Sequence, residues 1–181
     1  LWFEPEMVSE DSDLYRAHPD WAIQISGRSH TYSREQLVLD LSKEEVCDYL
    51  IEAVSAVLQS APISYVKWDM NRNITNIPEH QANHEKHEFY HRYMLGLYRV
   101  LEELNRRFPD ILFESCSGGG GRNDLGMLYY MPQAWASDNT DAIGRLSIQE
   151  GTGLIFPAIS VGSHVSAVPN HQTGRVTPLA T

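Results

Sequence analysis

The chain has 181 residues and a hydrophobic fraction of 42%, enough to bury a core, which excludes an intrinsically disordered chain. Its formal charge of −10 argues against a nucleic-acid partner, because phosphate binding needs a basic surface. No apolar run reaches the roughly 18 residues of a membrane span, and two cysteines are too few for a disulfide framework.

Runs of apolar and β-branched residues predict five short strands, at Leu1–Met7, Ile63–Asp69, Ile111–Cys116, Ala134–Asp138 and Leu154–Val161. Apolar residues at helical spacing predict helices over Ser42–Ala61 and Glu85–Phe108, and a further helical pattern follows Asp141. Ser42 and Glu45 have the spacing of a capping box. The irregular stretch Asp11–Glu35 is expected to be a long loop over the site.

Strands that alternate with helices predict an α/β fold with a parallel sheet and outer helices. Each predicted strand ends in a polar stretch, which is typical of a (β/α)8 TIM barrel, although a doubly wound sheet follows the same rule. A full barrel takes ~250 residues and eight strands. We therefore expect residues 1–181 to be the central part of a single, incomplete (β/α)8 barrel with about five parallel strands.

The segment Lys67-Trp68-Asp69-Met70-Asn71-Arg72 ends the second predicted strand. Side chains alternate along a strand, so Lys67 and Asp69 should point the same way and Trp68 the other way. A neighbouring lysine keeps an aspartate ionised, and an ionised, oriented carboxylate is a suitable nucleophile. A purely structural ion pair is the alternative reading of these residues.

Cys116 is followed after Ser117 by four glycines, Gly118 to Gly121. A glycine run permits unusual backbone conformations and close approach to a ligand. It lacks the ending of a phosphate loop and the spacing of a dinucleotide fingerprint, so a flexible turn is the alternative. Cys116 by itself fits a small buried side chain as well as a site residue.

The stretch after the fourth predicted strand holds two candidate acids, Asp138 and Asp141. Thr140 or Asp141 should cap the following helix, where the helix dipole favours a charged carboxylate and makes a poor proton donor. Asp138 lies three residues after Trp135 and is expected in a drier setting that favours the protonated form. Asp138 is therefore preferred as a general acid.

Two aspartates at neighbouring strand ends, one charged and one protonated, are the pair used in glycoside hydrolysis. Tryptophans suit stacking on a sugar face, although core packing explains them equally well. A competing pattern is the histidine run His80, His84, His87 and His91, whose helical spacing resembles that of zinc ligands. We favour a solvated polar face for this run and expect no metal and no cofactor.

Leu1 to Met7, Lys67 to Arg72, Cys116 to Arg122 and Trp135 to Asp141 resemble, in register, the α-galactosidases of glycoside hydrolase family 36, especially the bacterial cytosolic branch. The resemblance implies a retaining hydrolase that removes terminal α-galactose from melibiose- and raffinose-type oligosaccharides. It implies a cytoplasmic, homo-oligomeric (tetrameric) parent protein, and the charge and hydropathy of the chain predict no nucleic-acid or membrane partner.

Carried over by position, Asp69 matches the nucleophile and Asp138 the acid/base. The residues that match substrate-binding positions are Arg34, Lys67, Trp68, Asn71, Cys116 and Gly119, with Trp68 expected to face away from the sugar. Nothing in the chain matches the family's aspartate pair on an early barrel strand. An open sheet of about five strands would also leave unpaired edges and an uncovered face. We therefore expect the isolated chain to be unstable or to aggregate, and to be inactive.

The resemblance leaves two kinds of alternative open. An α-N-acetylgalactosaminidase or a galactosyl-transferring raffinose or stachyose synthase would share the mechanism and differ in the room around the sugar C2 or in the acceptor. A non-catalytic carbohydrate- or metal-binding module would instead use the histidine run.

Overall fold

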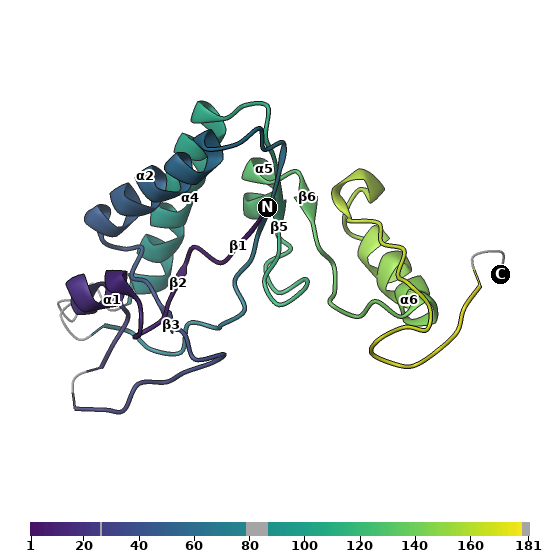
Figure 1. The fold of residues 1–181 in the computed structure, drawn as a ribbon, viewed down its shortest axis with the longest axis horizontal. Coiled ribbons are helices and arrows are strands. Elements are labelled where there is room, and N and C mark those ends of the chain that lie inside the picture. Colours follow the sequence, from purple (N-terminus) through teal and green to yellow (C-terminus); the bar gives the residue numbers. More distant parts are fainter. Residues whose placement is uncertain (26, 79–86, 179–181) are drawn as a thin grey trace. The chain divides into compact units, whose positions relative to one another are not determined.

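The computed structural model describes residues 1–25, 27–78 and 87–178, and the chain divides into two compact units, Leu1–Leu112 and Phe113–Thr181. Along the chain (Figure 1) the elements are β1 (Trp2–Phe3), β2 (Met7–Val8), α1 (Asp13–Ala17), η1 (Pro19–Trp21), β3 (Leu37–Val38), α2 (Glu44–Gln59), β4 (Tyr65–Trp68), α4 (Phe89–Arg107), β5 (Leu112–Ser115), α5 (Leu125–Tyr130), β6 (Gln133–Ala134), α6 (Ala142–Gly153) and η2 (Ala158–Ser160).

In the first unit, β1 pairs in parallel with β4, with Trp2 opposite Lys67 and Phe3 opposite Trp68. The predicted strand Leu1–Met7 is instead two short strands, because a turn at Glu4 to Met7 interrupts it and Pro5 has no N–H to donate. After the turn, β2 pairs antiparallel with β3. We had not predicted β3, which is too short to show a period.

Both long predicted helices of this unit are confirmed as α2 and α4, which lie side by side (Figure 1). The predicted start of the second helix, at Glu85, lies outside the described residues. The predicted capping box is wrong. Lys43 occupies the N-cap of α2 without a side-chain hydrogen bond, and the Ser42 hydroxyl donates to Asp40 at 2.5 Å.

The stretch predicted as the long loop Asp11–Glu35 contains α1 and η1 as well as irregular segments. Ser12 caps α1, because its hydroxyl accepts a hydrogen bond from the backbone N–H of Tyr15 at 3.1 Å. The prediction of an entirely irregular segment is therefore wrong at its N-terminal end.

In the second unit, β5 pairs in parallel with β6, with Glu114 opposite Gln133 and Ser115 opposite Ala134. The helix predicted after Asp141 is confirmed as α6. The chain beyond it, up to residue 178, turns back along α6 (Figure 1).

The fifth predicted strand, Leu154–Val161, is wrong. Its backbone N–H groups bond to nearby carbonyls, as in Ile155 to Thr152 at 3.1 Å, and η2 occupies its second half. Leu154 and Ile155 are 83% and 77% exposed, so their apolar character did not signal a buried strand. Val161 alone makes a parallel bridge, to Ala134.

The parallel pairings and the helices between them confirm the α/β class predicted from the alternation of elements. A search of the described residues finds no helix with the length and hydrophobicity that crossing a bilayer requires.

Candidate active site

Asp69 lies directly after β4, where its backbone N–H continues the parallel pairing by donating to the Phe3 carbonyl at 2.8 Å. Its side chain is held from both sides. Oδ2 accepts hydrogen bonds from Trp2 Nε1 at 3.1 Å and Asn71 Nδ2 at 2.7 Å, and Oδ1 accepts one from the Met70 N–H at 2.9 Å. Three donors favour the ionised carboxylate and fix its direction, and the residue is buried.

Side chains alternate along β4 as predicted. Trp68 is completely buried, and its indole N–H donates to Glu6 Oε1 at 2.8 Å, while the Tyr93 hydroxyl donates to Glu6 Oε2 at 2.6 Å. Lys67, on the opposite side of the strand, is half-buried. Trp68 therefore faces away from Asp69 as expected. Its match to a substrate-binding position stays a prediction.

Glu4, which the sequence had not singled out, joins several of the predicted site residues. Its carboxylate is only 7% exposed and accepts hydrogen bonds from Asn71 Nδ2 and, at 3.2 Å, from Gln36 Nε2. The Arg34 guanidinium lies 3.6 Å from Glu4 Oε1. Asn71 thus bridges Asp69 and Glu4, and the polar stretch at the end of β1 was the signal that could have identified Glu4.

Arg34 sits in a strained turn. Arg34 and Glu35 have φ angles of +54° and +59°, which residues other than glycine rarely adopt, and the Gln36 N–H closes the turn on the Ser33 carbonyl at 3.1 Å. Such conformations cost about 1 kcal/mol or more each and persist where surrounding contacts maintain them. Here the turn places Arg34 beside Glu4.

In the second unit, Asp138 lies beyond β6 on a segment whose backbone is well held. Trp135 Nε1 donates to Asp138 Oδ1 at 2.9 Å, and Gln172 Nε2 donates to the Asp138 carbonyl at 2.9 Å. The side chain of Asp138 is exposed, so the predicted dry setting is wrong for the described residues. Trp135 orients the carboxylate through its N–H and does not cover it.

The glycine run packs against this same segment. Gly118 and Gly119 have φ angles of +54° and +89°. A Cβ on Gly119 would lie 2.9 Å from the backbone nitrogen of Asp138, and one on Gly120 would lie 2.4 Å from the Ala136 carbonyl oxygen. The glycines therefore allow two backbones to approach each other, and they bring Gly119 beside Asp138. Cys116, just before the run, is buried.

Asp141 is the helix cap that the sequence predicted. Its side chain accepts from the Ile143 N–H at 3.0 Å at the start of α6, and its Oδ2 lies 3.0 Å from Arg175 Nη1. It is buried. Both oxygens of the carboxylate are therefore engaged in structural contacts at the start of α6.

The histidine run is only partly described, because His80 and His84 lie outside the described residues. In the described parts of the chain, no group of three or more His, Cys, Asp or Glu side chains is arranged to hold a metal ion.

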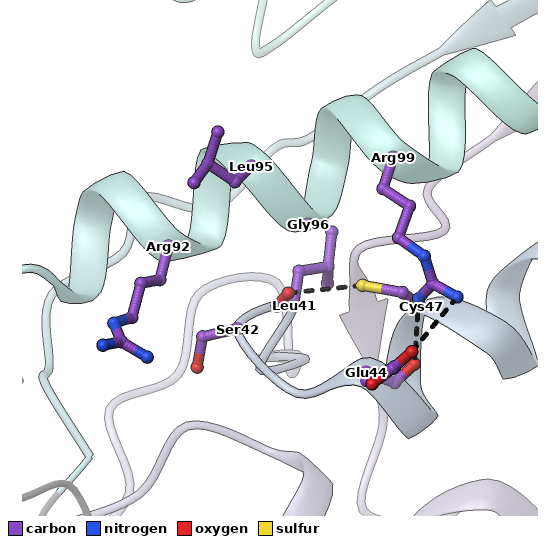
Figure 2. Close-up of a pocket in the computed structure, with 8 residues that line it drawn as sticks. All are labelled: Leu41, Ser42, Glu44, Cys47, Arg92, Leu95, Gly96 and Arg99. Carbon is purple, nitrogen blue, oxygen red and sulfur yellow. Dashed lines mark hydrogen bonds and ion pairs between the residues drawn. The ribbon is translucent and has the colours of Figure 1, made fainter.

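In the first unit, a cavity of about 270 Å³ lies between the start of α2 and the face of α4 (Figure 2). It is lined by Leu41, Ser42, Glu44, Cys47, Arg92, Leu95, Gly96 and Arg99. Arg99 pairs with Asp48 at 2.5 Å and with Glu44 at 3.7 Å. The buried Cys47 thiol donates to the Leu41 carbonyl at 3.2 Å, and burial raises the pKa of this thiol to about 11.

We expect Cys47 to resist alkylation. The thiolate is the reactive form, and a pKa raised to about 11 leaves very little thiolate at pH 8. Iodoacetamide should label native Cys47 roughly 100-fold more slowly than a free cysteine whose pKa is ~8.5, with a rate that climbs as the pH approaches 11. Peptide mass spectrometry separates Cys47 from Cys116, and urea-unfolded protein is the control. Fast labelling of native Cys47 at pH 8 would contradict this account.

Comparison with known proteins identifies relatives over the whole chain. A family model described as Melibiase matches residues 1–181. The chain is 63% identical over 182 residues to the α-galactosidase AgaA of Geobacillus stearothermophilus, covering 100% of this chain and 25% of that protein. It is 54% identical over 181 residues to the bifunctional α-galactosidase/sucrose kinase AgaSK of Mediterraneibacter gnavus, covering 100% of this chain and 19% of that protein.

The similarity extends to three dimensions. The crystal structure of AgaA, described as a GH36 α-galactosidase, matches with a TM-score of 0.95 at 62% identity over 99% of this chain and 25% of that chain. Two structures of AgaA variants, each with a TM-score of 0.95, contain stachyose and raffinose. The chain spans a quarter or less of the length of AgaA and AgaSK.

Proposed function

Because this chain belongs to the melibiase family, the α-galactosidases of glycoside hydrolase family 36, and forms part of their TIM-barrel-like catalytic domain, we propose that it supplies both catalytic carboxyls of a retaining α-galactosidase. In this proposal residues 1–181 are the central part of a single barrel domain. The observation that carries it is the set of donors around Asp69, which holds a buried carboxylate in one orientation at a strand end.

In the first step, a carboxylate oxygen of Asp69 attacks the anomeric carbon of the terminal galactose. The bond from that carbon to the glycosidic oxygen breaks, and the carboxyl of Asp138 transfers its proton to the departing oxygen. The products are a galactosyl ester on Asp69, the released aglycone alcohol and an ionised Asp138. Trp2 and Asn71 keep the attacking group in a single orientation.

In the second step, Asp138 removes a proton from a water molecule, whose oxygen attacks the same carbon from the face that the aglycone left. The ester bond to Asp69 breaks and its carboxylate is restored. Two inversions give net retention. The exposed position of Asp138 is compatible with a group that must exchange protons with an incoming water.

The remaining site residues are proposed as sugar contacts. Asn71 and Lys67 flank Asp69 on the strand end and are suited to donate to sugar hydroxyls, and Arg34 extends the same cluster through Glu4. Cys116 and Gly119 would line the pocket near Asp138. The tetrameric state and the cytoplasmic location belong to the same proposal and rest on the resemblance alone.

Raffinose- and stachyose-type oligosaccharides are the proposed substrates, together with melibiose. AgaA variants hold stachyose and raffinose, and the chain shares about three-fifths of its residues with AgaA, which supports the same substrate class here.

The leaving-group dependence of Asp138→Ala tests the proposal in the full-length protein that carries this chain. Removal of a general acid slows the first step by about 10²- to 10⁴-fold when the leaving group is a sugar alcohol. A nitrophenolate departs without protonation, so the loss in kcat/KM should be far smaller on an aryl α-galactoside than on raffinose. NMR of the first-formed galactose from the unaltered protein should show the α-anomer.

Asp141→Asn is the matched control, because it changes the neighbouring carboxylate that caps α6. It should lower the Tm and leave the ratio of the two kcat/KM values unchanged. A leaving-group effect in Asp141→Asn but not in Asp138→Ala, or β-galactose as the first product, would overturn the proposal.

A further inference from the structure

Arg145 on α6 is a buried arginine in the same unit as Asp138. Its guanidinium donates to three backbone carbonyls on two segments of the chain. Nη1 lies 2.8 Å from the Ser137 oxygen and 3.3 Å from the Asn139 oxygen, and Nη2 lies 3.2 Å from the Gly162 oxygen. Nη2 also donates to Gln149 Oε1, at 2.9 Å, on the same helix.

Two of these carbonyls flank Asp138 directly. Since Ser137 and Asn139 are the residues before and after it, one nitrogen of Arg145 holds the backbone on both sides of the proposed acid/base. The peptide units that determine where the Asp138 side chain starts are therefore tied to α6. Gln172 adds a bond to the Asp138 carbonyl itself.

Arg145 also supports the side chain that orients the Asp138 carboxyl. Its Cζ lies 4.7 Å from the centroid of the Trp135 ring, a cation–π contact, and the same ring donates its N–H to Asp138 Oδ1. His164 packs edge-on against Trp135, with 5.2 Å between ring centroids. The ring is thus held in place by Arg145 and His164.

These contacts are specific to a guanidinium. A planar guanidinium can donate hydrogen bonds to carbonyls in several directions while its face stacks on an indole ring. The single side-chain nitrogen of lysine cannot do both. Burial lowers the pKa of Arg145, which is the expected result of removing a charge from water. In the described parts of the chain the acceptors of its hydrogen bonds are neutral oxygens. These contacts therefore fix the positions of the accepting groups and do not neutralise the charge of Arg145.

We propose that Arg145 is a positioning residue for general acid/base catalysis, which fixes the 137–139 backbone and the Trp135 ring so that the Asp138 carboxyl meets the glycosidic oxygen. This inference rests on the proposed role of Asp138. It predicts that damage to Arg145 reproduces, in weaker form, the kinetic signature of losing Asp138.

The test is Arg145→Lys in the full-length protein, assayed on raffinose and on p-nitrophenyl α-galactoside. Misplacement of a catalytic group by about 1 Å can slow a reaction ~100-fold. We expect kcat/KM for raffinose to fall by about 10- to 100-fold, and kcat/KM for the aryl substrate, which needs little acid assistance, to fall by less than about 3-fold. Trp135→Phe keeps a ring over the guanidinium and deletes the N–H donor, so it should give the same pattern.

Arg175→Lys is the matched control. Arg175 pairs with Asp141 in the same unit, so its loss should lower the Tm without changing the ratio of the two kcat/KM values. Equal losses on both substrates in Arg145→Lys and Trp135→Phe, or a ratio no different from that of Arg175→Lys, would overturn the inference. If Asp138→Ala itself shows no leaving-group dependence, the proposed function fails first. If Asp138→Ala shows it and both positioning variants do not, the inference alone fails.

Discussion

Asp69→Asn in the full-length protein is expected to lower kcat/KM by roughly four orders of magnitude or more, on aryl and oligosaccharide α-galactosides alike. An amide oxygen carries no full negative charge and does not form the galactosyl ester. The equal loss on both substrates distinguishes this variant from Asp138→Ala, because nucleophilic attack is needed whatever the leaving group.

The fold should survive this change. Both oxygens of Asp69 accept hydrogen bonds, so either orientation of an asparagine amide points its NH2 group at a donor, Met70 N–H on one side or Trp2 and Asn71 on the other. The mismatch should destabilise the protein by about 1–3 kcal/mol. Steady-state kinetics together with thermal melting measure the two effects separately.

Asp48→Asn serves as the control for a lost carboxylate. Asp48 pairs with Arg99 on the surface of the helix pair, away from Asp69, and its replacement should leave kcat/KM unchanged. An Asp69→Asn protein that melts as a folded protein and keeps more than a tenth of the unaltered activity would refute the assignment of the nucleophile.

Gly96→Ala is expected to cause the largest loss of stability. A Cβ at this position would lie 1.8 Å from the Leu41 carbonyl oxygen and 3.1 Å from Cys47 Sγ. The obstacle is backbone, so relief requires α4 to move away from the loop that leads into α2. Overpacking of this kind costs about 3 kcal/mol or more, and the Tm should fall by several degrees.

Gly151→Ala is the comparison for this variant. Gly151 lies in α6, and apart from the neighbouring backbone of its own helix no described atom lies within 4 Å of a Cβ built there. Alanine is favoured over glycine in a helix by up to about 1 kcal/mol, so this protein should melt at the same temperature or slightly higher. Equal melting temperatures for Gly96→Ala and the unaltered protein would show that the helix pair is not closely packed at this point.

Local patterns in the sequence predicted the elements whose signal is periodic and long. Helices α2 and α4 show an apolar stripe over several turns, and both are confirmed. The predicted strand over Leu154–Val161 failed because a short apolar run carries no period that separates a strand from exposed turns. Strand β3, with two residues, offers no pattern to detect.

In the site, too, features set by local sequence could be predicted, and features set by distant contacts could not. The opposite orientations of Trp68 and Asp69 follow from the alternation of a strand, and the cap at Asp141 follows from helix-end chemistry, so both could be predicted. Arg145 could not be predicted, because its role depends on partners that the fold brings from elsewhere in the chain, such as Gly162. For Glu4 the polar stretch at the end of β1 was the only local signal, and its contact with Asn71 depends on the fold. The exposure of Asp138 likewise depends on what surrounds it in space.

The carboxylate of Glu4 contacts both Arg34 and Asn71, and this double contact constrains which substitutions the chain can accept during evolution. Since one group binds both Arg34 and Asn71, and Asn71 in turn binds Asp69, the turn that carries Arg34 and the proposed nucleophile are thermodynamically linked. Substitutions that adapt this turn to a new aglycone will alter the alignment of the carboxylate as well. Their energetic effects will not add independently, and selection for altered specificity will favour paired changes on the two sides of Glu4.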